Sequence, residues 1–118
     1  MNVPLDRIVD KIVGLGVPGL VLLIAVYVGG YAGGAALVAA LAALGGPLGM
    51  IGGIALLGIL VLISKGIADY GFERILRAAL MKMRAKGKQK AVIISELRGY
   101  WFISSKLKER MVRFIEDA

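Results

Sequence analysis

Cysteine and histidine are both absent from this 118-residue chain. Their absence excludes disulfides and thiolate chemistry, and it removes the commonest metal ligands and the usual general base. Serine is scarce, the carboxylates are scattered, and no glycine doublet is followed by Lys-Ser or Lys-Thr as in a phosphate-binding loop. We therefore expect a protein that is not an enzyme, with no catalytic residue, cofactor or metal site.

Charge is absent from nearly half of the chain, because no charged side chain occurs between Ile12 and Ser64. Apolar residues make up 58% of the sequence, and the mean hydropathy is +0.81. About 20 helical residues cross a hydrocarbon core of about 30 Å, so this run is long enough to cross twice. Gly45-Gly46-Pro47 would suit a tight turn. The run predicts a glycine-rich hydrophobic helical hairpin, buried either in a bundle or in lipid.

Glycines inside this run recur at four-residue intervals, which places each set on one face of a helix. A glycine costs about 0.5 to 1 kcal/mol against alanine in a helix interior, so these positions favour close helix packing or a conformational change. We predict helix packing or self-association there; tight packing within a small soluble bundle is the alternative. The sets are Gly29 with Gly33, Gly30 with Gly34, and Gly45 with Gly49 and Gly53.

The predicted fold is an all-α single domain over residues 1–118, a bundle of five to seven helices. Residues 12–64 form its hydrophobic hairpin and residues 65–118 its basic amphipathic helices. An amphipathic helix begins at Pro4 and ends at Gly14 or Gly16, and Pro18 starts the next, which is apolar all round over 20–28. That helix either stops near residue 29 or continues, kinked, to Leu44. Another begins near Pro47 and reaches at least Ser64.

In the second half of the chain, apolar residues recur at helical spacing, and residues that commonly cap helices stand at the ends of these segments. An apolar stripe runs from Ile67 to Met83 through Ala68, Phe72, Ile75, Leu76, Ala79 and Leu80. A helix over 91–98 should end at Gly99. Ser104 or Ser105 can cap a last helix that turns Leu107, Met111, Phe114 and Ile115 inward.

Positive charge is concentrated after Ser64, and the formal net charge is +7. Such cations contribute about 1 kcal/mol each near an anionic leaflet, so we predict contact with an anionic lipid membrane. The alternative is a solvated bundle face, and we expect no specific nucleic-acid partner. Seven cations follow one another without an acid between them: Arg74, Arg77, Lys82, Arg84, Lys86, Lys88 and Lys90.

The charge distribution also predicts a location. The first eleven residues have balanced charges, and the hydrophobic run is far longer than the core of a signal peptide. Cations that flank a hairpin favour the cytosolic side, so both termini should be cytosolic. We expect a protein that is cytoplasmic at rest and targets the inner face of the cytoplasmic membrane. The alternative is a protein integral to that membrane.

The order of these segments resembles the prokaryotic Bell domains, helical cell-death effectors compared with fungal HeLo domains and with the four-helix domain of the mixed-lineage kinase domain-like protein. The residues that carry the resemblance are Pro4-Leu5-Asp6, Gly16-Val17-Pro18-Gly19-Leu20, Leu44-Gly45-Gly46-Pro47-Leu48-Gly49-Met50-Ile51-Gly52-Gly53, Leu62-Ile63-Ser64-Lys65 and the basic tail. The resemblance implies a bundle that oligomerises after a receptor signals and permeabilises the inner membrane in antiphage defence or conflict. The short amyloid-forming motif that often ends these proteins is not evident.

The sequence thus predicts a membrane-disrupting effector that self-associates on activation, with an upstream receptor as a further partner. Two other classes stay open. One is a constitutive two-pass membrane protein, such as a holin-like lysis protein or a small membrane scaffold. The other is a soluble helical adaptor that binds a protein through its apolar surface.

Overall fold

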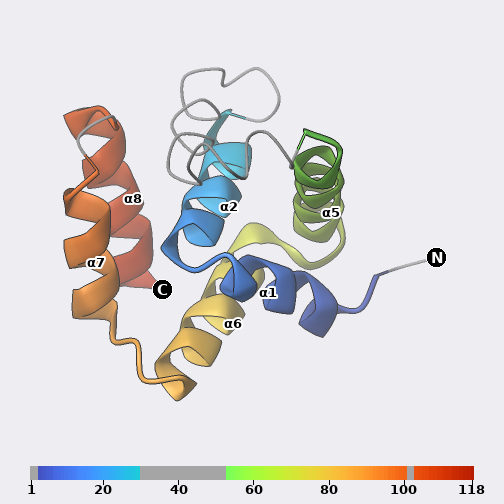
Figure 1. Ribbon diagram of the computed structural model, residues 1–118, viewed down its shortest axis with the longest axis horizontal. Helices are drawn as coiled ribbons and strands as arrows, with labels where there is room; N and C mark the ends of the chain where they lie inside the picture. Colours follow the sequence, from blue (N-terminus) through green and yellow to red (C-terminus); the bar gives the residue numbers. More distant parts are fainter. Residues whose placement is uncertain (1–2, 30–52, 101–102) are drawn as a thin grey trace.

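The structure is a computed structural model that describes residues 3–29, 53–100 and 103–118. Across these ranges it contains six α-helices and no strand (Figure 1). The predicted all-α bundle is therefore confirmed. The helices are α1 (Leu5–Gly14), α2 (Val17–Gly29), α5 (Gly53–Tyr70), α6 (Phe72–Ala85), α7 (Lys90–Arg98) and α8 (Ser105–Asp117).

Helix α1 is amphipathic, as its sequence predicts. Its apolar side chains Ile8, Val9, Ile12 and Val13 are buried, while the charged residues between them are exposed. Pro4 precedes the helix, and its carbonyl oxygen accepts hydrogen bonds from the amides of Arg7 and Ile8. Gly16 has a φ of +75°, a conformation open to glycine at little cost, and it turns the chain directly into α2.

Helix α2 is the centre of the molecule and carries no charged residue. In Figure 1 it lies between the α7–α8 pair and α5, and it packs against α1, α5, α6 and α7. Its residues from Leu20 to Ala25 are at most 1% exposed. The predicted burial of 20–28 is confirmed as far as Val26, but Tyr27 is 48% exposed. Over the described part of the chain the core contains no polar or charged side chain.

The predicted stripe from Ile67 to Met83 is interrupted, and in this respect the sequence interpretation was wrong. Helix α5 ends at Tyr70, Gly71 takes a φ of +90°, and α6 begins at Phe72 in a new direction. Ala68 is consequently exposed rather than buried. The later members of the stripe are buried as expected, namely Phe72, Ile75, Leu76, Ala79, Leu80 and Met83. The spacing of apolar residues stays helical across Gly71, so the sequence pattern does not show the break. The backbone nevertheless changes direction there, because glycine can adopt a positive φ.

Helices α7 and α8 form a pair whose ends follow the predicted signals. Gly99 follows the last residue of α7. Ser104 caps α8, and its hydroxyl oxygen accepts a hydrogen bond from the Leu107 amide at 3.3 Å. Met111 and Ile115 are buried as predicted, Leu107 and Phe114 are half-buried, and Val112 is an additional buried residue.

The structure describes the two ends of the predicted hydrophobic hairpin. The part before residue 30 belongs to α1 and α2, and the part from residue 53 belongs to α5, which continues past Ser64 to Tyr70. None of the helices in the described ranges is both long enough and apolar enough to cross a membrane. The predicted turn at Gly45-Gly46-Pro47, and the choice between a break and a kink after Gly29, lie outside the described residues.

Close approach at glycine occurs at two positions that the four-residue repeats did not include. A Cβ atom on Gly19 would lie 2.0 Å from the carbonyl oxygen of Ile12, where α1 and α2 meet. A Cβ atom on Gly66 would lie 2.9 Å from Cδ1 of Ile8, a side-chain end that can move. Among the described residues, Gly58 has no atom within 4 Å of the same position. Backbone contact therefore makes Gly19 the most constrained of the three.

This difference predicts opposite effects of two glycine-to-alanine changes. Gly19→Ala should lower the free energy of unfolding by about 1 to 3 kcal/mol or more, because the methyl group meets backbone that cannot rotate away. Gly58→Ala should raise it by about 0.5 to 1 kcal/mol, because alanine favours the helix and meets no neighbour. Urea unfolding followed by circular dichroism measures both. Equal effects of the two changes would contradict the packing at Gly19.

Candidate functional site

Three of the seven predicted membrane-contact residues lie along the outer face of α6. Arg74, Arg77 and Arg84 are exposed, and their spacing places them on one side of the helix together with Met81. Met81 is 66% exposed, the largest exposed fraction among the large apolar side chains of the described residues. We call these four residues the α6 basic face. It combines cations with a flexible apolar side chain.

The other four predicted cations are arranged differently. Lys82 lies toward α1, where its amine pairs with the carboxylate of Asp10. Lys88 pairs with Glu96 at 3.3 Å, and the Lys90 amine donates a hydrogen bond to the carbonyl oxygen of Ala118 at 2.5 Å. Lys86 is exposed just after the end of α6. Sequence spacing could not distinguish these roles, because the partners of Lys82 and Lys90 are 72 and 28 residues away and the partner of Lys88 lies in the next helix.

The pair between Lys82 and Asp10 joins α6 to α1 at the surface. The hydrogen bond to Asp10 raises the pKa of Lys82 above its ordinary value, and the nearby negative charges of Asp10 and Asp6 act in the same direction. Exposed pairs of this kind contribute little to stability, because water screens them. We therefore regard it as a contact that orients α1 on α6 and opens at little cost.

A groove runs beside the α6 basic face. Its volume is about 790 Å³. Its apolar lining comes from α1, α2, α5 and α6, and Glu73, Arg74 and Arg77 are its charged residues. A smaller hollow of about 90 Å³ adjoins it and shares Arg77 and Met81, with Arg84 and Lys90 on its far side. The apolar lining is Leu5, Tyr27, Tyr70, Phe72, Ala78 and Met81, with Gly71 at the joint.

Three aromatic rings join the exposed end of α2 to α6 and α8. The rings of Tyr27 and Phe72 are stacked with centroids 3.9 Å apart, and Phe114 meets them edge-on at 5.8 and 5.2 Å. Such aromatic pairs contribute about 0.5 to 1.5 kcal/mol each beyond the area that they bury.

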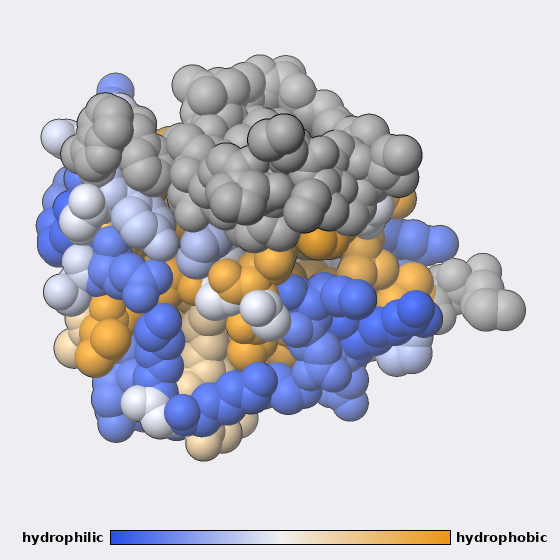
Figure 2. All heavy atoms as spheres, viewed as in Figure 1, coloured by the Kyte–Doolittle hydropathy of each residue, from blue (hydrophilic) through white to orange (hydrophobic). Residues whose placement is uncertain are grey.

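The surface drawn in Figure 2 is mixed. Hydrophilic atoms cover much of its lower part, and hydrophobic atoms are exposed between them. Helix α8 also displays three cations on one side, Lys106, Arg110 and Arg113, but the acids Glu116 and Asp117 are exposed on the same helix. The α6 basic face has Glu73 at its edge and no acid between Arg74 and Arg84. It therefore presents the more uniform positive charge.

The glycine sets predicted for helix packing lie mostly beyond the described residues. Gly29 is the last residue of α2, and Gly53 is the first residue of α5. Gly30, Gly33, Gly34, Gly45 and Gly49 all fall between residues 30 and 52, outside the described ranges. Their role in self-association stays a prediction.

Comparison with known proteins gives no family: no family model matches the chain, and no curated protein or solved structure matches it either. The likeness to Bell domains accordingly rests on the pattern of the sequence alone.

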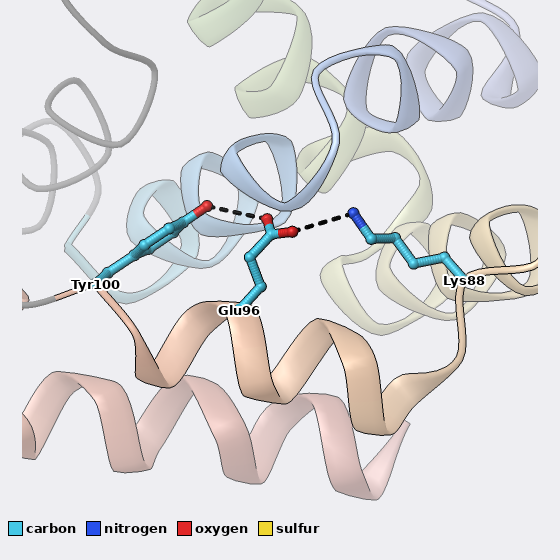
Figure 3. A network of polar contacts seen from close by, with 3 residues as sticks. All are labelled: Lys88, Glu96 and Tyr100. Carbon is cyan, nitrogen blue, oxygen red and sulfur yellow. Dashed lines mark hydrogen bonds and ion pairs between the residues drawn. The ribbon is translucent and has the colours of Figure 1, made fainter.

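A polar network fixes the start and end of α7. Glu96 lies between Lys88 and Tyr100, accepting a hydrogen bond from the Tyr100 hydroxyl at 3.1 Å (Figure 3). Partial burial raises the pKa of Tyr100 to about 12, with further contributions from the negative charge of Glu96 and from this hydrogen bond. The neutral phenol is thus the form that the fold favours.

This shift predicts a late step in the tyrosine titration. The unfolded chain should lose the Tyr100 proton near pH 10 and the folded protein near pH 12, so the contribution of Tyr100 to stability falls as the pH rises between these values. Absorbance of tyrosinate should show a step near pH 12 that Tyr100→Phe removes. Glu96→Gln should lower this pKa but leave it above 10, because burial is the largest cause. A Tyr100 step at pH 10 in the folded protein would refute the assignment.

Proposed function

We propose that this protein is a membrane-disrupting effector domain. In this proposal, the protein binds the inner face of an anionic cytoplasmic membrane through the α6 basic face. It then releases its central helix into the bilayer, and assembles into a lesion that permeabilises the cell. Such an effector would serve a cell-death response in bacterial immunity or conflict, with an upstream receptor to start it and with the protein cytoplasmic at rest.

One observation carries this proposal: the helix at the centre of the bundle has no polar side. Helix α2 gains its stability from burial, about 1.5 to 3 kcal/mol for each large apolar side chain. Lipid hydrocarbon is as apolar as the protein core, so α2 can exchange one surrounding for the other without exposing those side chains to water. Its 13 residues reach about 20 Å, short of a bilayer core of about 30 Å. The residues that follow α2 lie outside the described ranges, and their sequence is uncharged.

The surrounding contacts favour a bundle that can open. Helices α1 and α6 carry the charged faces that shield α2, and the Asp10–Lys82 pair that joins them is exposed. The chain lacks disulfides because it has no cysteine. Opening would therefore separate amphipathic helices without breaking a buried polar contact in the described core. Membrane affinity would in part replace the lost packing.

The α6 basic face should be needed for binding and for permeabilisation. Changing Arg74, Arg77 and Arg84 to Glu should weaken binding to phosphatidylglycerol vesicles by more than about a hundredfold, because each cation contributes about 1 kcal/mol near an anionic surface. Cells that express this variant should take up less propidium iodide than cells that express the parent. Vesicle sedimentation and dye uptake measure the two effects at matched protein levels.

The control makes the same charge change on α8, with Lys106, Arg110 and Arg113 replaced by Glu. It should retain most of the binding, because α8 already carries interspersed acids. If both triple variants lose binding equally, net charge rather than the α6 basic face recruits the protein. Absence of dye uptake with the parent protein would favour the adaptor or scaffold reading.

A reversible cross-link should control the release of α2. In Asp10→Cys/Lys82→Cys, a thiol-cleavable bismaleimide joins α1 to α6 at two side chains that are already in contact. The native chain has no cysteine, so the reaction is specific. The linked protein should still sediment with anionic vesicles but should not release an entrapped dye. Cleavage of the linker should restore dye release.

A link within the α7–α8 pair provides the matched control. Arg98 and Glu109 pair at 2.8 Å, so Arg98→Cys/Glu109→Cys accepts the same reagent. Dye release should continue in this linked variant, because α7 and α8 need not separate for α2 to leave. Unchanged leakage with α1 joined to α6 would exclude opening at this contact. A constitutive two-pass protein would instead stay in the membrane fraction during carbonate extraction.

A further inference from the structure

The groove beside α6 is open to solvent and has the volume of a ligand site. Its volume of about 790 Å³ lies within the range of roughly 300 to 1,000 Å³ that is usual for ligand pockets. Four helices contribute to its lining, so residues far apart in the sequence meet there. Most of this lining is apolar, with charged residues along one helix.

The apolar part of the groove leaves large side chains in water. Met81 is 66% exposed and Tyr27 is 48% exposed, and both side chains line the groove. A ligand in the groove would cover this apolar surface. Methionine is unbranched and adapts its shape to an irregular partner. Tyr27 presents a ring held in place by its stack on Phe72. The two side chains form a surface suited to a flexible hydrocarbon chain.

The charged part of the groove suits a phosphate. Arg77 lines both the groove and the adjoining hollow, and Arg74 and Arg84 lie on the same face about one turn before it and two turns after it. Arg77 has no ion-pair partner among the residues that the structure describes. A guanidinium can donate hydrogen bonds to two phosphate oxygens at once, so it selects a phosphate by its shape as well as by its charge. Glu73 sits at the edge and disfavours an anion there.

We propose that the α6 groove is a specific site for one anionic phospholipid molecule. Arg77, with Arg74 or Arg84, binds the phosphate, and an acyl chain lies over Ala78 and Met81 toward Tyr27. This inference rests on the proposed function and goes beyond it, because it requires a defined site for a single lipid rather than attraction to a charged surface. Charge complementarity together with the apolar lining selects a lipid over a free anion.

The test uses a lipid that forms no membrane. Dihexanoyl-phosphatidylglycerol below its critical micelle concentration should bind the full-length protein in calorimetry. Dihexanoyl-phosphatidylcholine and inorganic phosphate should each bind at least about tenfold more weakly, because one has no net charge and the other has no acyl chain. Arg77→Gln should weaken binding of the anionic lipid by about tenfold, near the contribution of a charge-assisted hydrogen bond. Met81→Gln should also weaken it by about tenfold, because the variant loses apolar contact with the acyl chain.

Matched controls remove an exposed apolar side chain and an exposed arginine elsewhere. Val92→Gln on α7 and Arg110→Gln on α8 should leave the dissociation constant within about twofold. All four side chains are exposed, so the variants should fold, and thermal unfolding checks this. The site is refuted if the controls weaken binding as much as the groove variants do. It is also refuted if phosphate alone binds as tightly as the lipid.

Vesicle sedimentation separates this inference from the proposed function. A protein that binds phosphatidylglycerol vesicles but not the monomeric lipid would overturn the groove site and leave surface recruitment intact. A protein that binds the monomeric lipid but neither binds nor permeabilises vesicles would support the groove site and overturn the proposed function.

Discussion

From Leu20 to Val26, helix α2 has no side that can face water, and the arrangement of the other helices follows from this constraint. A helix that is apolar all round is stable only when neighbours cover it on every side. Here α1, α5, α6 and α7 provide that cover, and their own apolar stripes complete the core. The described core contains no polar side chain, so its cohesion comes from burial and packing. Cohesion of this kind is non-directional.

Because apolar packing has no required direction, the core could open without losing specific bonds, which matters for the proposed function. A core held by buried hydrogen bonds would lose them on opening, whereas an apolar core can be transferred to lipid with its contacts exchanged for similar ones. The charged side-chain pairs Asp10 with Lys82 and Arg98 with Glu109 lie at the surface, and the hydrogen bond from the Tyr70 hydroxyl to the Val3 carbonyl oxygen is half-buried. The more directional contacts lie at the exposed end of α2, where Tyr27 stacks on Phe72. The same end of α2 borders the α6 groove.

In the proposed function, this shared position would connect lipid binding in the groove to the release of α2. Tyr27 and Phe72 belong both to the aromatic cluster and to the lining of the groove. A ligand in the groove would contact the rings that hold the end of α2 against α6. Occupancy by a lipid would thus be sensed at the helix whose release we propose, without a separate signalling path through the core.

The sequence by itself determined the helical class, most helix ends and the identity of most buried residues. Gly16 and Ser104 are local signals, because a positive φ or a capping hydroxyl acts within a few residues. Gly99 follows the last residue of α7 and keeps a right-handed helical conformation, with a φ of −75°. The period of Phe72, Ile75, Leu76 and Ala79 likewise fixed the buried face of α6. Only the tertiary structure decided which cations stay unpaired, because the partners of Lys82, Lys88 and Lys90 come from other elements. It also decided the break at Gly71 and the close contact at Gly19, since a glycine in sequence does not reveal which backbone will approach it.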